Sequence, residues 1–168
     1  MCGRSLSIAL LIWAALGALP DSAVAGRGEP WIRLETWACY GTCPVYVVSV
    51  SRDGQVSYQG KEFVLQTGAR RRSLRIAELT RLQKAVEESG FWGLSEKCCD
   101  CRDVTDNPWT VVEVVKDGAT KKIAHYDGCQ SAPRTVPELA VTIVSLTGAI
   151  KWIGTHEQRF RHKWPRRR

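Results

Sequence analysis

The sequence predicts an α+β fold: an antiparallel sheet built from two β-hairpins plus an N-terminal strand, with two helices packed on one face. Two Asp-Gly pairs, Asp53-Gly54 and Asp117-Gly118, each separate runs of β-branched or alternating residues. Such pairs are typical of hairpins with type I′ turns, in which both central residues need positive φ. Two other stretches repeat apolar residues at helical spacing. The composition, 44% hydrophobic and 24% charged over 168 residues, excludes a mostly disordered or fibrous chain.

The first strands lie on either side of a cysteine-containing turn. Residues 32–36 alternate weakly and predict the N-terminal strand, which the turn at residues 39–44 closes. Residues 45–50 and 56–59 then form the two arms of the first hairpin. Residues 63–65 either extend this hairpin or add a strand.

An amphipathic helix is expected after the first hairpin. Arg70, Arg71 and Arg72 are interpreted as an exposed loop, because three like charges follow one another. Ser73 is placed to cap the helix and Gly90 to end it. The apolar stripe of this helix consists of Ile76, Leu79, Leu82 and Val86.

A second hairpin and a second helix complete the predicted domain. Residues 109–115 and 119–124 form the hairpin arms. Thr135 and Glu138 then have the spacing of a capping box, with Pro137 in the first helical turn. The apolar stripe of this helix consists of Leu139, Ile143, Leu146 and Ile150.

Residues 1–25 have the pattern of a secretory signal peptide. Arg4 gives a basic start, residues 6–19 are apolar, and Ala23-Val24-Ala25 forms a small-x-small cleavage site. An uncleaved anchor is the minor alternative, because this run is shorter than the roughly 20 residues of a spanning helix. We therefore expect a periplasmic or secreted protein with a single domain over residues 26–154 and a basic C-terminal tail over residues 155–168.

Most of the net charge of +7 is in that tail. Residues 156–168 contain six arginines or lysines against Glu157, a net +5. Arginines interleaved with aromatic residues suit an anionic envelope surface, although a purely solvated tail is an open alternative. No nucleic-acid partner is expected for an exported chain. The candidate contact residues are Arg159, Arg161, Lys163, Trp164, Arg166, Arg167 and Arg168.

Two cysteine-containing motifs resemble a bacterial family of exported proteins that is known only as a domain of unknown function. Residues 39–46 read Cys-aromatic-Gly-Thr-Cys-Pro-x-Tyr, and residues 125–129 read His-Tyr-x-Gly-Cys. With the match at residues 152–154, the resemblance covers roughly residues 31–154. It implies a small α+β domain and brings no established activity or catalytic residue. The sequence departs from the family pattern in its Cys98-Cys99 pair and its arginine-rich tail.

Six cysteines remain once the signal peptide, with Cys2, is removed, and an even set in an exported chain indicates disulfides. Sequence alone leaves their connectivity open. We favour one bridge between Cys39 and Cys43, across a tight turn, and one between Cys101 and Cys129, on either side of the second hairpin. The adjacent Cys98 and Cys99 are possible extra thiols, which pair with neighbouring cysteines, pair with a second chain or stay free.

The sequence gives less support to redox activity or metal binding at these cysteines. Redox activity would need a reducible short-loop bridge, but the Cys-x-x-Cys spacing of thioredoxin-like enzymes is absent. Metal ligation competes with oxidation of the same thiols in an exported protein. His125 and Asp127 have the spacing of a base with an orienting carboxylate, but a histidine that stabilises the turn or shields a cysteine is the simpler interpretation.

The sequence contains no nucleophile elbow, zinc-protease motif or phosphate-binding loop. We expect an exported, disulfide-stabilised, non-enzymatic binding or structural module of the cell envelope, without cofactor or metal. Its partner is either an anionic envelope surface or another envelope protein. The alternative is a thiol–disulfide oxidoreductase, or an accessory to one, that uses Cys39 and Cys43.

Overall fold

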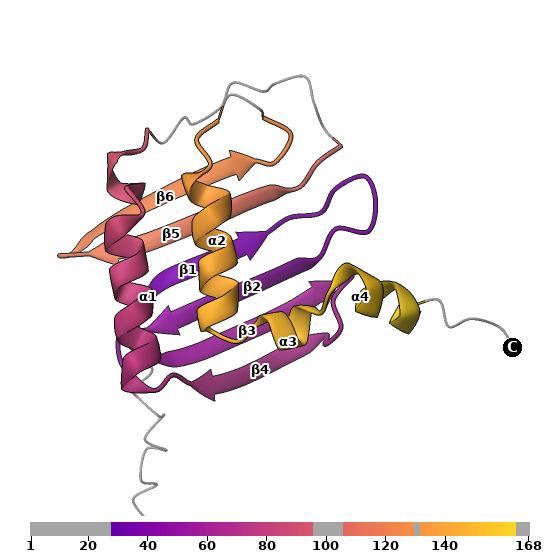
Figure 1. The fold of residues 1–168 in the computed structure, drawn as a ribbon, viewed down its shortest axis with the longest axis horizontal. Helices are drawn as coiled ribbons and strands as arrows, with labels where there is room; N and C mark the ends of the chain where they lie inside the picture. Colours follow the sequence, from indigo (N-terminus) through magenta and orange to yellow (C-terminus); the bar gives the residue numbers. More distant parts are fainter. Residues whose placement is uncertain (1–27, 96–105, 130–131, 164–168) are drawn as a thin grey trace, which may run out of the picture.

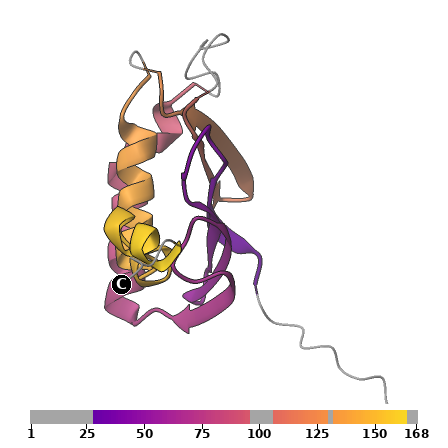
Figure 2. The ribbon, with the colours of Figure 1, turned by 90° about the vertical axis from the view of Figure 1, so that its right-hand side faces the viewer.

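The computed structural model describes residues 28–95, 106–129 and 132–163. These residues form a mixed α/β fold with a six-stranded antiparallel sheet in the order β4-β3-β2-β1-β5-β6 (Figure 1). The strands are β1 (Pro30–Thr36), β2 (Val45–Ser51), β3 (Gln55–Glu62), β4 (Gly68–Ser73), β5 (Trp109–Lys116) and β6 (Ala119–Tyr126). The helices are α1 (Ile76–Glu88), the short 3₁₀-helix η1 (Phe91–Gly93), α2 (Thr135–Leu146), α3 (Ile150–Ile153) and α4 (His156–Lys163). Figure 2 shows two layers, with these helices on one side of the sheet.

The two expected hairpins are present, but their turns differ. Asp117 and Gly118 have φ values of 51° and 79°, so the second hairpin has the type I′ turn that the sequence predicts. In the first turn only Gly54 has a positive φ, and its N–H donates to the carbonyl of Ser51 at 2.9 Å. The turn is therefore centred one residue earlier than expected, and the left-handed glycine follows it.

The interpretation of Arg70–Arg72 as a loop is wrong. Gly68–Ser73 forms the edge strand β4, which pairs with β3 in a register that places Arg71 opposite Ser57 and Arg72 opposite Val56. The sequence pattern does not indicate this strand, because charged side chains line it and an edge strand does not need alternating apolar residues. The loop lies instead at residues 63–67, where we expected strand.

The N-cap of helix α1 is Arg75, two residues later than the expected Ser73, and the helix begins at Ile76. Leu82 and Val86 are fully buried and Leu79 packs against the core, whereas Ile76 is 85% exposed. The helix ends at Ser89 and Gly90, and Gly90 has a φ of 73°. Three of the four expected stripe residues therefore face the core.

Helix α2 lies where we expected it, but its capping box does not form, because Arg134 takes the N-cap position without a side-chain cap. Leu139 and Ile143 are buried as expected. Ile150 is 46% exposed, since the chain turns at Gly148 with a φ of 69° before α3 begins. The expected continuous stripe is thus broken after α2.

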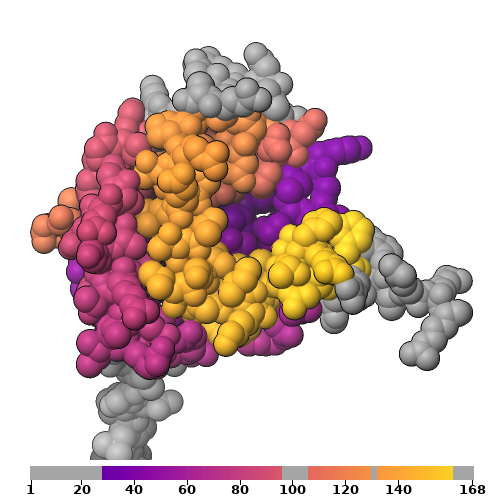
Figure 3. All heavy atoms as spheres, viewed as in Figure 1, coloured from indigo at the N-terminus to yellow at the C-terminus, as the bar shows by residue number. Residues whose placement is uncertain are grey.

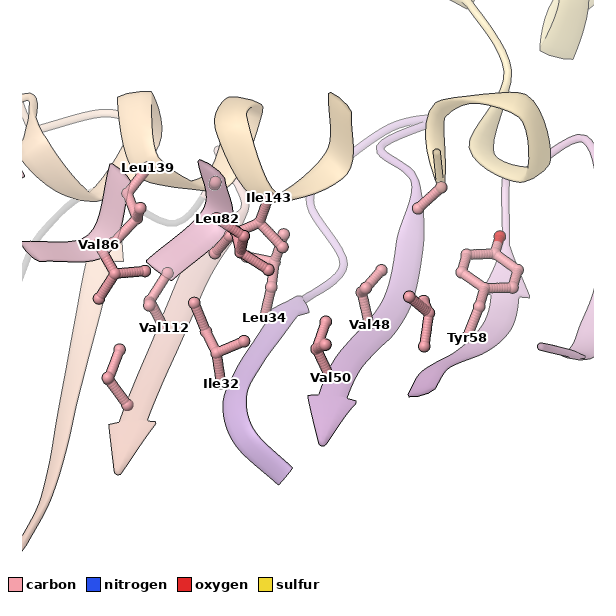
Figure 4. Close-up of a cluster of buried hydrophobic side chains, with 14 of the residues drawn as sticks. Ile32, Leu34, Val48, Val50, Tyr58, Leu82, Val86, Val112, Leu139 and Ile143 are labelled. Carbon is pink, nitrogen blue, oxygen red and sulfur yellow. The ribbon is translucent and has the colours of Figure 1, made fainter. Parts of the chain in front are cut away.

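The main core lies between α1, α2 and the sheet (Figure 4). Leu82 and Val86 of α1 and Leu139 and Ile143 of α2 pack down onto apolar side chains of the strands. The labelled strand residues are Ile32, Leu34, Val48, Val50, Tyr58 and Val112. Burial of this apolar face is the main source of stability for a two-layer fold.

The Glu78 carboxylate joins the end of β4 to the start of α1. Its Oε2 accepts hydrogen bonds from the Arg75 backbone N–H and from Arg72, both at 2.8 Å. These bonds, together with one from the Arg75 side chain, lower the pKa of Glu78 to about 2 from its usual 4.5. Because the folded pKa is the lower one, this stabilisation is present above pH 4.5 and is lost as the pH falls toward 2.

Replacing Glu78 by glutamine is therefore expected to lower the melting temperature at about neutral pH, and the difference from wild type should shrink below about pH 4. Circular dichroism melts across this pH range measure the effect. Glu87→Gln, on an exposed position of the same helix, is the matched control and should differ little from wild type at any pH. A Glu78→Gln effect that is independent of pH would contradict the role of the charged carboxylate.

Candidate ligand-binding clefts beside helix α4

A row of polar side chains crosses the helix-facing side of the sheet at one end of the apolar core. The register places Tyr46 beside Thr36, Thr36 beside Thr110, and Thr110 beside His125. All four residues are buried. The adjacent row, which includes Tyr58, is apolar and belongs to the core. The polar row thus forms the boundary of the apolar core, beyond which buried side chains have groups that can form hydrogen bonds.

His125 is a buried neutral imidazole rather than an oriented base. Burial lowers its pKa, and its Nδ1 has no hydrogen-bond partner among the described residues. Its Nε2 lies 4.0 Å from Oδ1 of Asp127, which is longer than a hydrogen bond. The same Asp127 oxygen accepts a hydrogen bond from Thr110 at 3.2 Å, while burial raises the pKa of Asp127. This arrangement agrees with a structural histidine.

The loop between β1 and β2 contains a disulfide between Cys39 and Cys43, whose Cα atoms are 5.7 Å apart. Both cysteines are half-buried, and Tyr40 between them is 90% exposed. Cys129 is also disulfide-bonded, with a partner outside the described residues. It packs with Tyr126, in a small second cluster beside Trp109 and Ala132. The expected positions Cys98, Cys99 and Cys101 lie outside the described residues.

The chain continues past residue 154 as helix α4 rather than as an extended tail. Thr155 and Gln158 form a reciprocal capping box, in which each side chain accepts a hydrogen bond from the backbone N–H of the other, at 2.8 and 3.2 Å. The spacing Thr-x-x-Gln is a recognisable sequence signal for a helix start at this position. Of the expected basic contacts, Arg161 and Lys163 lie on α4, and Trp164, Arg166, Arg167 and Arg168 lie outside the described residues.

Backbone hydrogen bonds join the loop at residues 63–67 to α3. The N–H of Leu65 donates to the carbonyl of Ile153 at 2.9 Å, and that of Gln66 donates to the carbonyl of Trp152 at 2.8 Å. Arg159 of α4 donates to the carbonyl of Gly154 at 2.6 Å. The start of α4 is therefore held against the loop between β3 and β4.

Two clefts share the side chain of Arg159. The first, here called the aromatic cleft, has a volume of about 390 Å³ and lies between α4 and the β3–β4 loop. Phe63, Val64, Leu65 and Phe160 provide its apolar lining, and its polar lining comes from Thr42, Lys61, Glu62, Thr67, His156 and Arg159. Phe63 has a φ of 51°, a left-handed conformation that is costly for a bulky residue and here occurs at a cleft wall.

The second cleft, here called the aliphatic cleft, has a volume of about 300 Å³ and lies between β2, α2, α3 and α4. Its apolar lining consists of Ala140, Val141, Val144, Ile150 and Ile153, and Tyr46 and Arg159 contribute polar groups. A hollow between α2 and α4 is visible in Figure 3, with the indigo and purple N-terminal strands at its floor.

Arg159 is the charged group that both clefts have in common. Burial lowers its pKa, although arginine remains a cation at physiological pH. Burial also raises the pKa of the Tyr46 hydroxyl, so tyrosine is a neutral donor and acceptor there. A fixed cation beside apolar walls can hold the anionic group of a ligand whose body is apolar.

The described residues contain no cluster of three or more histidine, cysteine, aspartate or glutamate side chains that could hold a metal ion. Within the same residues no single helix is long and apolar enough to cross a membrane. Taken together, α2 and the helical segment Ile150–Phe160 have the length and the apolar composition of a membrane span. The two parts are bent by 89° relative to each other.

A family model described as a domain of unknown function, DUF6438, matches residues 30–147. The matched range includes the whole sheet, α1, α2 and the disulfide loop. It ends before α3 and α4, so Arg159 and the α4 wall of both clefts lie beyond it. No curated protein matches the chain.

Proposed function

The chain belongs to the DUF6438 family, and for this member we propose an exported, disulfide-stabilised binding module of the cell envelope that holds a small amphipathic anion beside Arg159. Export is supported by the signal-peptide pattern of residues 1–25 and agrees with the disulfides at Cys43 and Cys129. The observation that carries the binding role is the aromatic cleft with its cationic side.

The chemistry of the aromatic cleft selects the class of ligand. Its apolar walls favour an aromatic or short aliphatic body, which loses contact with water on binding. Arg159 and Lys61 favour an anionic head group, because a charge-assisted hydrogen bond is about twice as strong as a neutral one. Lys61 also pairs with Glu35 at 3.3 Å, so Arg159 is the principal anion-binding group.

A fluorescent probe of this chemistry, anilinonaphthalene sulfonate, is expected to bind the mature folded protein. Arg159→Gln should weaken binding about tenfold or more, because a hydrogen bond to a charged group contributes about 1.5–3 kcal/mol. Arg159→Lys keeps the charge and should lose less. The measurement is a fluorescence titration, with circular dichroism melts to verify that each variant is folded.

Matched variants locate the probe. Thr67 is exposed on the rim of the aromatic cleft and Ser145 on the rim of the aliphatic cleft. Thr67→Trp should block binding, whereas Ser145→Trp should leave it unchanged. Arg81→Gln, on the exposed face of α1, is the control for loss of one positive charge. Equal binding by Arg159→Gln and wild type, or a block by Ser145→Trp alone, would contradict the proposal.

Thiol–disulfide exchange at Cys39 and Cys43 is a second candidate function. One observation favours it: both cysteines are half-buried in a loop whose Tyr40 is 90% exposed, so an external thiol can reach the bridge. A pair that is readily reduced by mild reductant in the folded protein supports exchange. A resistant pair supports a purely structural bridge.

A further inference from the structure

On the sheet face opposite the helices, strands β1 to β4 carry a row of side chains with an arginine at each end, and Glu113 of β5 follows next to Arg33. The register places Arg33 beside Ser49, Ser49 beside Ser57, and Ser57 beside Arg71, across β1, β2, β3 and β4. Three strand spacings separate the two arginines at the backbone, which is about 14 Å. No described helix covers this face (Figure 2).

A shallow groove of about 390 Å³ follows this row. Its lining includes four cationic residues and no carboxylate: Arg33, Lys61, Arg70 and Arg71. The floor consists largely of short side chains, Ser49, Ser57 and Ala69. We refer to this surface as the basic groove.

The cations of the basic groove are only partly neutralised. Glu35, next to the groove, accepts hydrogen bonds from Arg33 at 3.0 Å and from Lys61 at 3.3 Å. One carboxylate thus serves two cations, and both of these side chains remain 40% or more exposed. Arg71 has no ion-pair partner among the described residues and is exposed. The groove therefore keeps an excess of positive charge.

We propose that the basic groove binds a carboxylated polysaccharide, with Arg33 and Arg71 pairing with successive acidic sugars. Guanidinium groups match carboxylates in geometry and bind them with two hydrogen bonds. Ser49, Ser57 and Gln59 lie between the cations and can exchange hydrogen bonds with sugar hydroxyls. Lys61 lines both this groove and the aromatic cleft, whereas Arg33 and Arg71 line the groove and neither cleft beside α4, so these two arginines distinguish the site from the proposed function there.

The composition of the groove disfavours other polyanions. The groove lining contains one aromatic residue, Tyr58, which is 2% exposed and so offers no stacking surface for nucleic-acid bases. It also contains no exposed large apolar side chain that could enter a lipid surface or anchor a protein partner. A hydrated, carboxylate-rich chain needs neither feature.

The test uses the full mature protein and immobilised polygalacturonate, with dextran as the neutral polysaccharide, at near-physiological salt. Polygalacturonate should bind and dextran should not. Arg71→Gln should weaken binding about threefold, in line with an exposed charge pair, and Arg33→Gln with Arg71→Gln about tenfold. Added salt should weaken binding further. Arg81→Gln removes one charge on the helical side and should leave binding unchanged.

Three results would overturn the proposal. Equal losses for Arg81→Gln and Arg71→Gln would show attraction to net charge alone. The groove would belong to another class of partner if single-stranded oligothymidine or phosphatidylglycerol vesicles bound more strongly than polygalacturonate and if that binding depended on Arg71. Loss of polygalacturonate binding in Thr67→Trp, which leaves the groove intact, would place the polysaccharide at the aromatic cleft instead.

Discussion

Replacing Cys129 by serine is expected to lower the free energy of unfolding by about 3–4 kcal/mol. This figure applies if Cys129 pairs with Cys101, which closes a loop of about 29 residues around the second hairpin. Cys129 is 6% exposed and packs beside Tyr126. Serine at this position would add a buried hydroxyl in place of a sulfur, which increases the cost unless it finds a hydrogen bond.

Thermal and denaturant unfolding of the oxidised mature protein measure this loss. Cys43→Ser opens only the short loop at Cys39–Cys43 and should cost less, about 2 kcal/mol. Cys101→Ser should match Cys129→Ser, whereas Cys98→Ser should not. If Cys98→Ser is the variant that matches, the pairing proposed for Cys101 is wrong.

Replacing Gly60 by alanine is expected to destabilise the protein by about 1–3 kcal/mol, as overpacking of a filled site does. A Cβ at Gly60 would approach the carbonyl oxygen of Gln66, the Tyr58 hydroxyl at 2.7 Å and a Val64 methyl at 2.9 Å. These contacts leave no room for the methyl, because the closest one is backbone. The β3–β4 loop would have to move away from β3.

The same substitution should impair the aromatic cleft, because Val64 and Leu65 form part of its wall. We expect Gly60→Ala to bind anilinonaphthalene sulfonate more weakly even at temperatures where it remains folded. Gly93→Ala is the matched control, since no atom lies within 4 Å of a Cβ at that glycine and its φ is not positive. Equal melting temperatures for the two variants would contradict the close packing at Gly60.

Local patterns predict much of the fold correctly. The Asp-Gly pair at Asp117 determines a type I′ turn through its own conformational preference, so sequence alone is sufficient there. At Asp53 the turn is centred one residue earlier than expected, because the carbonyl of Ser51 accepts the hydrogen bond from Gly54 that closes it. Leu82 and Ile143 are buried because helical spacing places them on the core side.

The candidate sites could not be predicted in the same way, because they depend on strand register. Arg33 and Arg71 are far apart in the chain and share a row only through the pairing of β1, β2, β3 and β4. Tyr46 and His125 are likewise joined across four strands. Arg159 could have been placed on a helix from the Thr155–Gln158 spacing, but its cleft depends on the distant β3–β4 loop.

The order of the strands also affects solubility. Among the described strands, β4 and β6 are the two edges of the sheet, and an edge strand has backbone groups that another chain could extend by edge-to-edge pairing. Each edge carries consecutive cations, Arg70 to Arg72 on β4 and Lys121 with Lys122 on β6. A second copy that approached either edge would bring like charges together. The charge that the sequence places in these strands therefore protects the sheet against aggregation.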